Sequence, residues 1–381
     1  MKNAISFLSS HELEGRQTGS KGEELSAIYL ADQLQDIGIQ PYYQNYFQPF
    51  TFTFVNKKKD TSTRVNLNGT NVVGYINNHK KKTIILGAHY DHLGTNQFGQ
   101  GKDVNDTISF LPGADDNASG VALLLSLSHK LVNSEKDPQA NYIIAFFSGE
   151  ELGLHGSKYL ANQLAENKVS AISMLNFDMV GRLNERKELT IDGLGTSSIF
   201  DSLIGLANRT HEFKIQSNKS GVGSSDYTSF YLDSIPVLSF TTGVHADYHT
   251  IHDTEEKINY EGMLVIQQFI LSCIELLEVN TIDYQQTKVE KSRSRSSLKV
   301  TLGIMPGYGN ELGLQIEAVT NGKTAEQYGL QKGDIIVGIG ECKVTSIYDY
   351  MDCLKSYEIG DEANIHFLRK EQETTIQVKF K

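Results

Sequence analysis

The sequence has few cysteines, no long hydrophobic run and a deficit of positive charge. Its 381 residues include only three cysteines, Cys273, Cys342 and Cys353, and their spacing matches no common metal site. Because an odd number of cysteines forms no closed set of disulfides, we expect buried or free thiols. No apolar run reaches the about 18 residues that a membrane-spanning helix requires, so we expect no membrane span.

The charge balance and the amino terminus exclude further classes. The chain carries 35 basic and 46 acidic side chains, a formal net charge of −11, which argues against a nucleic-acid partner. The first apolar patch, residues 4–8, is too short for a secretory signal peptide. If the natural protein is exported, we therefore expect its signal to be absent from this sequence.

Stretches typical of strands alternate with stretches of helical periodicity over most of the first 280 residues. The predicted strands are 83–88, 141–147, 171–177 and 235–240, and the predicted helices are 23–37, 121–132, 155–166, 197–210 and 261–278. Residues 42–73 are rich in aromatic and β-branched side chains and predict a β-hairpin. The alternation predicts an α/β domain whose largely parallel sheet is covered on both faces.

A polar segment interrupts this alternation. The run Lys291–Ser296 alternates basic residues with serines and has no apolar period, which favours a solvated linker over a basic contact site. The residues beyond it have short strands, one helix and the length of a small independent domain. We therefore predict a large domain over residues 1–283, a linker over 284–297 and a small domain over 298–381.

Chemically active side chains follow the predicted strands of the large domain. In chain order they are His89, Asp91, Glu150, Glu151, Asp178, Tyr248 and His249. A further acidic pair, Asp115 and Asp116, stands in a glycine-bounded turn before the second predicted helix. Sites in open α/β sheets lie outside the carboxyl ends of the strands, so we expect these residues to meet at one edge.

Each of these motifs is common without a function, but together they predict a metal site. A Glu-Glu pair usually lies on a solvated surface, and an Asp-Asp pair before a helix is usually a cap. Asp178 differs because it follows an apolar strand, where carboxylates need a partner. Two imidazoles and three carboxylates suit a two-zinc site, and one glutamate of the pair is available as a general base. Such a site suits peptide hydrolysis.

Five ordered motifs now resemble the family-28 metallopeptidases, a group of zinc aminopeptidases. They are Gly87–His92, Gly113–Gly120, Ser148–Gly153, Asn176–Gly181 and Asp247–Thr250, and the segment Leu8–Arg16 resembles the start of the family domain. The similarity spans about residues 5–280. The resemblance implies a three-layer α/β/α, phosphorylase-like fold with a mostly parallel central sheet. It also implies an aminopeptidase that acts on peptide substrates.

The resemblance also implies a set of metal ligands. His89 and Asp178 would bind one zinc ion, and Glu151 and His249 would bind the other. Asp116 would bridge the two ions, because the family's bridging ligand stands four residues before the last glycine of its motif. Zn²⁺, two ions per chain, is therefore the expected cofactor.

Other residues receive roles from the same resemblance. Glu150 would be the general base, Asp91 would orient His89, and Tyr248 would help to hold the oxyanion. Asp115 is the less favoured alternative for the bridge. For three further imidazoles, His92, His245 and His252, we expect a structural or pocket-rim role rather than metal binding.

The end of the chain resembles the PDZ domains of bacterial proteases. The run Ala325–Ile336 carries the resemblance, and Leu302–Ile304 looks like the loop that holds a peptide carboxylate. Such domains bind the end of a peptide by adding a strand to a sheet edge. The alternative is a domain that packs on the enzyme and binds no peptide.

Two other functions compete with the aminopeptidase. A glutaminyl-cyclase-like acyltransferase uses a related scaffold with one working zinc, and a decayed, non-catalytic binding module is the third alternative. The presence of all five expected ligands and the base favours the peptidase. Proteins with this pair of domains are mostly exported bacterial enzymes, so we expect a periplasmic or cell-surface location.

Overall fold

The structure is a computed structural model whose described residues fall into two compact units, Met1–Thr287 and Lys288–Lys381. The described residues are 1–56, 63–97, 101, 110–287, 300–306, 312–320, 322–345, 347–370 and 372–380. Most of the predicted linker, including Lys291–Ser296, lies outside them. The exact boundaries 283/284 and 297/298 therefore stay a prediction.

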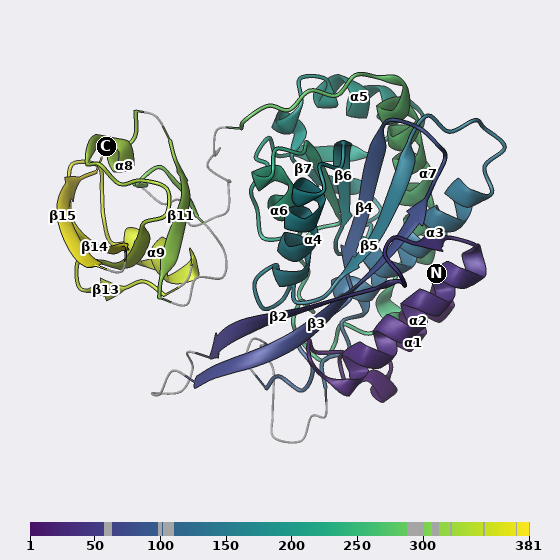
Figure 1. Ribbon diagram of the computed structural model, residues 1–381, viewed down its shortest axis with the longest axis horizontal. Helices are drawn as coiled ribbons and strands as arrows, with labels where there is room; N and C mark the ends of the chain where they lie inside the picture. The colour runs from purple at the N-terminus through teal and green to yellow at the C-terminus, as the bar shows by residue number, and fades with distance from the viewer. Residues whose placement is uncertain are drawn as a thin grey trace. The chain divides into compact units, whose positions relative to one another are not determined.

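The first unit is built on a mixed sheet with a parallel centre (Figure 1). Its four central strands, in spatial order, are β5 (Asn141–Phe147), β4 (Thr83–His89), β6 (Ala171–Phe177) and β9 (Val237–Thr241). All residues of β4 and β5 are buried, as expected of strands covered on both faces. The parallel arrangement matters for the site because it brings the carboxyl ends of these strands to one edge.

The strands next to this centre run antiparallel to it: β3 (Thr63–Ile76) beside β5, and β7 (Glu188–Asp192) beside β9. Beyond them, β1 (Gln40–Pro41) and β2 (Phe47–Asn56) pair antiparallel with β3, and β8 (Lys214–Ser217) pairs parallel with β7. The hairpin predicted over 42–73 is therefore present as β2 and β3. The short strands β7 and β8 were not predicted, because neither contains a long apolar stretch.

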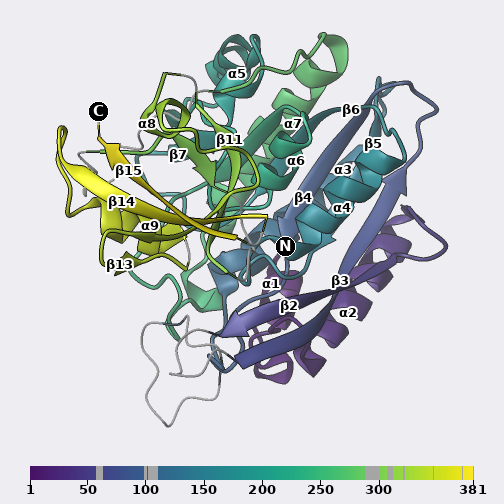
Figure 2. The same ribbon diagram turned by 60° about the vertical axis from the view of Figure 1, so that its left-hand side comes forward.

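Helices cover both faces of the sheet and complete three layers (Figures 1 and 2). One face carries α1 (Lys2–Leu8), α2 (Lys21–Ile37), α3 (Gly120–Val132), α5 (Phe200–Ala207) and α7 (Tyr260–Val279), and the other carries α4 (His155–Glu166) and α6 (Tyr227–Leu232). Helix α2 is capped at its start by Ser20, whose hydroxyl accepts a hydrogen bond from the N–H of Glu23, and at its end by Gly38 with φ 88°. The predicted three-layer α/β/α fold is confirmed.

Helix α7 is the one described helix that is long and apolar enough to cross a membrane by length and composition. More than half of its most apolar stretch is buried within the protein. Residues such as Ile266, Phe269 and Ile270 are completely buried in the core of the first unit. Burial against the other helices accounts for its apolar character.

The second unit has its own antiparallel sheet and core. Its elements are β10 (Ile304–Pro306), β11 (Leu314–Val319), α8 (Thr324–Gln327), β12 (Ile335–Ile339), β13 (Cys342–Lys343), α9 (Ile347–Leu354), β14 (Glu362–Arg369) and β15 (Gln372–Lys379). Arg369 fixes the loop before β12, since its guanidinium donates to both carboxylate oxygens of Asp334, at 2.7 and 2.6 Å. The predicted β-rich small domain is present.

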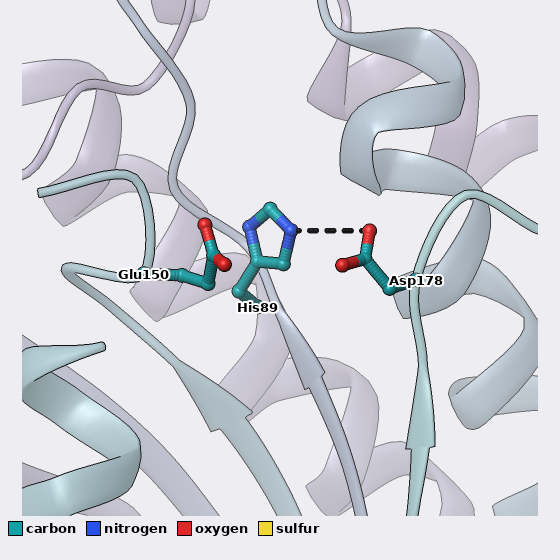
Figure 3. Close-up of side chains that lie close together, drawn as sticks. All are labelled: His89, Glu150 and Asp178. Atoms are coloured by element: carbon teal, nitrogen blue, oxygen red, sulfur yellow. Dashed lines mark ion pairs between the residues drawn. The ribbon is translucent and has the colours of Figure 1, made fainter. Parts of the chain in front are cut away.

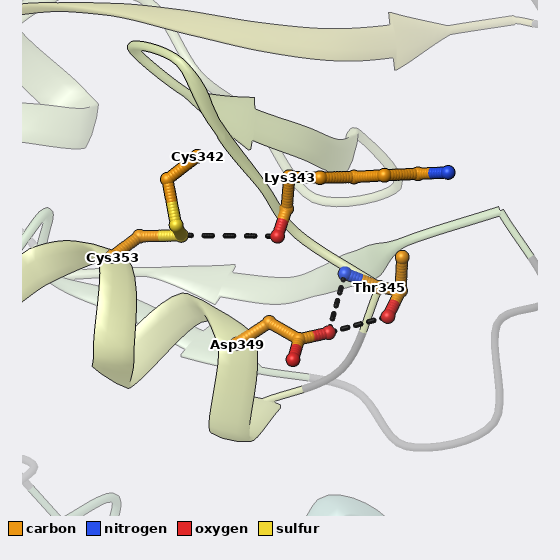
Figure 4. The surroundings of a disulfide bond; sticks show 5 residues. All are labelled: Cys342, Lys343, Thr345, Asp349 and Cys353. Carbon is orange, nitrogen blue, oxygen red and sulfur yellow. Dashed lines mark hydrogen bonds between the residues drawn. A yellow bond between two sulfur atoms is a disulfide. The ribbon is translucent and has the colours of Figure 1, made fainter. Parts of the chain in front are cut away.

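The expectation that all three cysteines are thiols is wrong. Cys342 and Cys353 form a disulfide that joins β13 to α9 (Figure 4). Only Cys273, buried in α7, is a free thiol among the described residues. The cysteine count could not show this pairing, because the approach of α9 to β13 depends on how the second unit folds.

Thiol titration tests this pairing directly. We expect one reactive thiol per chain in protein that is unfolded without reductant, and three after reduction. The double variant Cys342→Ser/Cys353→Ser should also unfold its second unit more easily, by about 2–4 kcal/mol, because the open loop gains entropy when unfolded. Three thiols in the unreduced, unfolded protein would show that the disulfide does not form.

Candidate metal centre

The carboxyl ends of the central strands bring the predicted ligands together. His89 is the last residue of β4, Glu151 follows β5, and Asp178 follows β6 directly. His249 lies in the loop after β9, and Asp116 lies in the turn before α3. Five side chains from separate parts of the sequence thus meet at the carboxyl edge of the sheet, as expected for residues that follow parallel strands.

Asp116 lies between two imidazoles and directs one oxygen to each. Its Oδ1 is 3.5 Å from His89 Nε2, which is also 3.4 Å from Asp178 Oδ1. Its Oδ2 is 3.1 Å from His249 Nε2, which is 3.3 Å from Glu151 Oε2. The five side chains therefore form two triads that share the Asp116 carboxylate. The first triad is His89, Asp116 and Asp178, and the second triad is His249, Asp116 and Glu151.

The spacing within these triads fits a metal ion. Atoms held about 2.0–2.2 Å from one tetrahedral cation lie roughly 3.3–3.6 Å from each other. Asp116 Oδ2 and His249 Nε2 are buried and make no hydrogen bond within the part of the chain that the structure describes, although they are 3.1 Å apart. Two buried polar atoms that approach without bonding to each other fit a shared cation between them.

Glu150 lies beside the first triad. Its carboxylate, His89 and Asp178 offer ligand atoms within 4.8 Å of one another. Figure 3 shows the His89 ring between the Glu150 and Asp178 carboxylates, with the ion-pair contact on the Asp178 side. Glu150 is therefore close enough to the centre to exchange a proton with a molecule bound there.

The geometry distinguishes the two adjacent aspartates. Asp115 is fully buried; its Oδ1 accepts the N–H of Gly181 at 2.6 Å, and its Oδ2 lies 3.1 Å from His245 Nε2. The N–H groups of both aspartates donate to Asp253 Oδ2, at 2.9 and 3.0 Å. Asp115 thus anchors the turn, while Asp116 faces His89 and His249.

Asp91 links the His89 strand end to the Glu150 loop. Its Oδ1 accepts the Glu150 N–H at 3.2 Å, and its Oδ2 accepts the hydroxyl of Thr18 at 2.8 Å. Its main-chain carbonyl lies 3.2 Å from His89 Nδ1, closer than its carboxylate, at 3.8 Å. The hydrogen-bond contact with His89 is thus made by the Asp91 main chain rather than by the predicted carboxylate, and the carboxylate instead holds the Glu150 loop, a contact that the sequence did not indicate.

The additional imidazoles occupy different positions. His92 Nδ1 lies 2.8 Å from Glu151 Oε1, so it holds the oxygen that does not face His249. His245 contacts Asp115, as described above, and His252 is exposed. His92 thus holds a carboxylate of the centre and His245 contacts a carboxylate of the adjacent turn, whereas His252 lies on the surface.

Tyr248 lies against the second triad. Its ring stacks on that of His249, with centroids 3.7 Å apart and an interplanar angle of 25°. Burial raises the pKa of the Tyr248 phenol, and the carboxylates of Asp116 and Glu151 raise it further. The phenol therefore stays protonated and keeps an O–H that can donate a hydrogen bond beside the centre.

The two adjacent glutamates have opposite electrostatic environments. Burial raises the pKa of the Glu150 carboxyl well above its usual value, and Glu151 adds to this while His89 opposes it. Burial acts on Glu151 in the same direction, but His249 and His92 outweigh it and hold that pKa well below its usual value. Among the protein groups alone, Glu151 is therefore the permanent anion and Glu150 the group suited to proton exchange.

Arg16 connects several main-chain segments around the centre. The sequence did not assign it a role. Its completely buried guanidinium donates to main-chain carbonyls 2.6–3.3 Å away; they belong to Leu8, Tyr90, Pro112, Gly113 and Asp116. Burial lowers its pKa to about 10, and Asp116 and Asp253 oppose that shift. The signal was present in the Leu8–Arg16 segment, but a contact across some hundred residues cannot be inferred from spacing.

Asp226 is a second buried acid near the centre. Burial raises its pKa to about 7, against the effect of His89, and its charge in turn raises the pKa of Glu150. The structure places Asp226 within electrostatic range of the proposed base.

Comparisons with known proteins identify two domains in the chain. The profile of peptidase family M28 matches residues 71–274, and that of the PDZ domain matches residues 287–380. The aminopeptidase YwaD of Bacillus subtilis is 31% identical over 169 residues, which cover 42% of this chain and 36% of that relative. The chain thus matches well under half of that relative's length.

Solved structures share the fold at low sequence identity. A zinc aminopeptidase from Bacillus subtilis superposes with a TM-score of 0.56 at 17% identity, over 74% of this chain and 94% of that chain. A glutaminyl cyclase from Bacteroides thetaiotaomicron, bound to N-acetylhistamine, gives 0.57 at 19% identity, over 72% and 95%. The family profile covers more than half of the sequence, so the chain belongs to peptidase family M28 and carries a PDZ domain after its peptidase domain.

Proposed function

We propose that the protein is a zinc-dependent metallopeptidase that binds two zinc ions and removes residues from the amino terminus of peptides. The observation that carries this proposal is the Asp116 carboxylate, whose two oxygens face two separate imidazole–carboxylate pairs. Imidazole nitrogens and carboxylate oxygens suit zinc. The M28 family and the names of its relatives support the aminopeptidase reading.

The residues of this chain divide the chemistry among them. Zinc in such a site polarises a peptide carbonyl and increases the acidity of water. Glu150 accepts a proton from the attacking water and passes it to the leaving amine. Asp91 holds the Glu150 main chain in place, and Tyr248, whose ring stacks on His249, would donate its O–H to the oxygen that becomes negative.

The first triad separates this proposal from a glutaminyl-cyclase-like activity. A one-zinc site needs only a single triad, whereas this chain places His89 and Asp178 on the far side of Asp116 as well. These residues would have no ligand role around a single ion bound at Glu151 and His249. We therefore favour hydrolysis over cyclisation.

Metal analysis and a peptide panel test the proposal together. We expect about two zinc ions per chain, loss of activity on exhaustive chelation and recovery with zinc or cobalt. Peptides with a free amino terminus should lose one residue at a time, and their N-acetylated counterparts should resist. Full activity without metal would refute the metal assignment, and internal cleavage of the acetylated peptides would refute the exopeptidase. Cyclisation of N-terminal glutamine without hydrolysis would support the alternative.

We also propose that the PDZ domain binds the carboxyl end of a peptide. Gly303, in the segment that resembles a carboxylate-binding loop, has φ 76° and precedes strand β10. Its own N–H is bonded to Thr301 Oγ1 at 3.1 Å, so a peptide carboxylate would need other donors of this loop. Binding of peptides with a free or an amidated carboxyl end tests this role.

A location outside the cytoplasm is the last part of the proposal. The Cys342–Cys353 disulfide supports it, because disulfides persist mainly in oxidising compartments. We therefore propose a periplasmic or cell-surface location. Fractionation of cells that express the natural gene, with a cytoplasmic marker as reference, tests it.

A further inference from the structure

The β2–β3 hairpin has one apolar and one polar face. Cross-strand pairing places on the apolar face Phe50, Phe52, Phe54, Val65, Leu67 and the main chain of Gly69. On the polar face, Thr51 Oγ1 donates to Asn68 Oδ1 at 3.0 Å, and Thr53 Oγ1 donates to Asn66 Oδ1 at 2.8 Å. The family match begins at residue 71, so this part of the hairpin is outside the matched region.

The apolar face packs on helix α4 through stacked rings. The Phe50 ring stacks on Tyr159, with centroids 5.6 Å apart, and Phe52 stacks on His155 at 3.8 Å with an interplanar angle of 19°. Phe50 is buried, whereas Phe52 and Phe54 are only partly buried. Part of this face thus remains accessible beside the amino-terminal end of α4.

The same rings reach the residue that precedes the proposed base. A Cβ placed on Gly149 would lie 3.2 Å from the Cβ of His155 and 3.7 Å from the rings of Phe50 and Phe52. Gly149 also accepts the N–H of His155 at 3.0 Å and adopts φ 74°. The aromatic face therefore adjoins the loop that carries Glu150.

The aromatic face beside Glu150 corresponds to the leaving side of the peptide bond to be cleaved. Glu150 must deliver its proton to the leaving amine, so the leaving part of the peptide has to lie beside Glu150. Burial, together with the smaller effect of Lys158, lowers the pKa of His155 to about 4, so the ring is neutral near pH 7. Phe52 and His155 thus present an uncharged aromatic wall next to the leaving side.

We propose that Phe52, supported by His155 and extended by Phe54, forms the subsite for the residue that follows the cleaved bond, and that it selects peptides with an aromatic or bulky apolar residue there. This inference rests on the proposed peptidase function. Continuity with the catalytic loop identifies the occupant, because a substrate chain leaving Glu150 on this side meets this face first.

Two dipeptides with the same first residue test the subsite. We expect wild-type enzyme to hydrolyse Leu-Phe with a kcat/KM about tenfold above that for Leu-Ala, the size of effect typical of filling an apolar pocket. Phe52→Ala should bring the ratio close to one, mainly through a higher KM for Leu-Phe. Phe52→Leu should restore part of the preference, since leucine keeps apolar volume.

Matched variants separate a subsite from a folding role. Thr51→Ala, on the opposite face of the same strand, should keep both the activity and the ratio. If Phe52→Ala proves insoluble, Phe54→Ala provides the test instead. That residue is farther from the α4 contact, and its loss should also lower the ratio. Equal hydrolysis of both dipeptides by the wild type, or an unchanged ratio in soluble Phe52 and Phe54 variants, would overturn the subsite and leave the peptidase proposal standing. A metal-loaded wild type that cleaves neither dipeptide would overturn both.

Discussion

The Glu150→Gln variant is expected to keep both metal ions and lose most of its turnover. A glutamine has nearly the same shape, but its amide cannot accept the proton that hydrolysis releases near neutral pH. General acid–base assistance contributes roughly 10²–10⁴ in rate, so kcat should fall by about that factor or more. The substrate KM should change much less, because the amide still fills the position beside His89. Steady-state kinetics and metal analysis of the purified variant measure both quantities.

The neighbouring residue supplies the matched control. Glu151 lies 3.3 Å from His249 Nε2 and is held by His92, so Glu151→Gln should weaken or lose one metal ion. Activity in that variant should recover partly at high zinc concentration, whereas Glu150→Gln should not respond to added zinc. A Glu150 variant that loses zinc, beside a Glu151 variant that binds two ions and is merely slow, would reverse the two roles.

The largest loss of stability is expected for Arg16→Met. The methionine keeps much of the side-chain volume but leaves the carbonyls of Tyr90, Pro112 and Gly113 without their buried donor. It also removes the positive charge that lies within electrostatic range of Asp116 and Asp253. Removing one partner from such a buried charged network costs about 3–5 kcal/mol, a large part of a typical free energy of unfolding. Denaturant unfolding of the metal-loaded and chelated protein measures the change.

Two further substitutions make this prediction sharper. Arg16→Lys keeps the charge but cannot reach all five carbonyls, so its loss of stability should be smaller. Arg186→Met removes an exposed arginine and should change the unfolding free energy by less than about 0.5 kcal/mol. If Arg16→Met unfolds at the same denaturant concentration as Arg186→Met, the buried network does not stabilise the fold.

Local patterns predicted most of the fold that positions the centre. Strands β4, β5 and β6 are short apolar runs, and helices α2 and α7 show apolar side chains at helical spacing, so their positions follow from side-chain periodicity alone. Polar residues immediately after such strands predicted where His89, Glu151 and Asp178 would meet, because parallel strands end at one edge. Strands β7 and β8, the last two at one end of the sheet, were missed, since their stability depends on neighbours rather than on a pattern of their own.

Local sequence patterns are sufficient to predict the parallel centre of the sheet, the residues at its carboxyl edge and the presence of a second, β-rich domain. Periodicity depends on a few neighbouring residues, and the order of the motifs is read directly along the chain. Neither requires knowledge of the fold. Three features required the folded chain: Asp116 faces both imidazoles while Asp115 anchors the turn, Cys342 pairs with Cys353, and Arg16 binds the main chain around the centre. These choices depend on side-chain direction and on contacts between distant segments, which spacing along the chain does not specify.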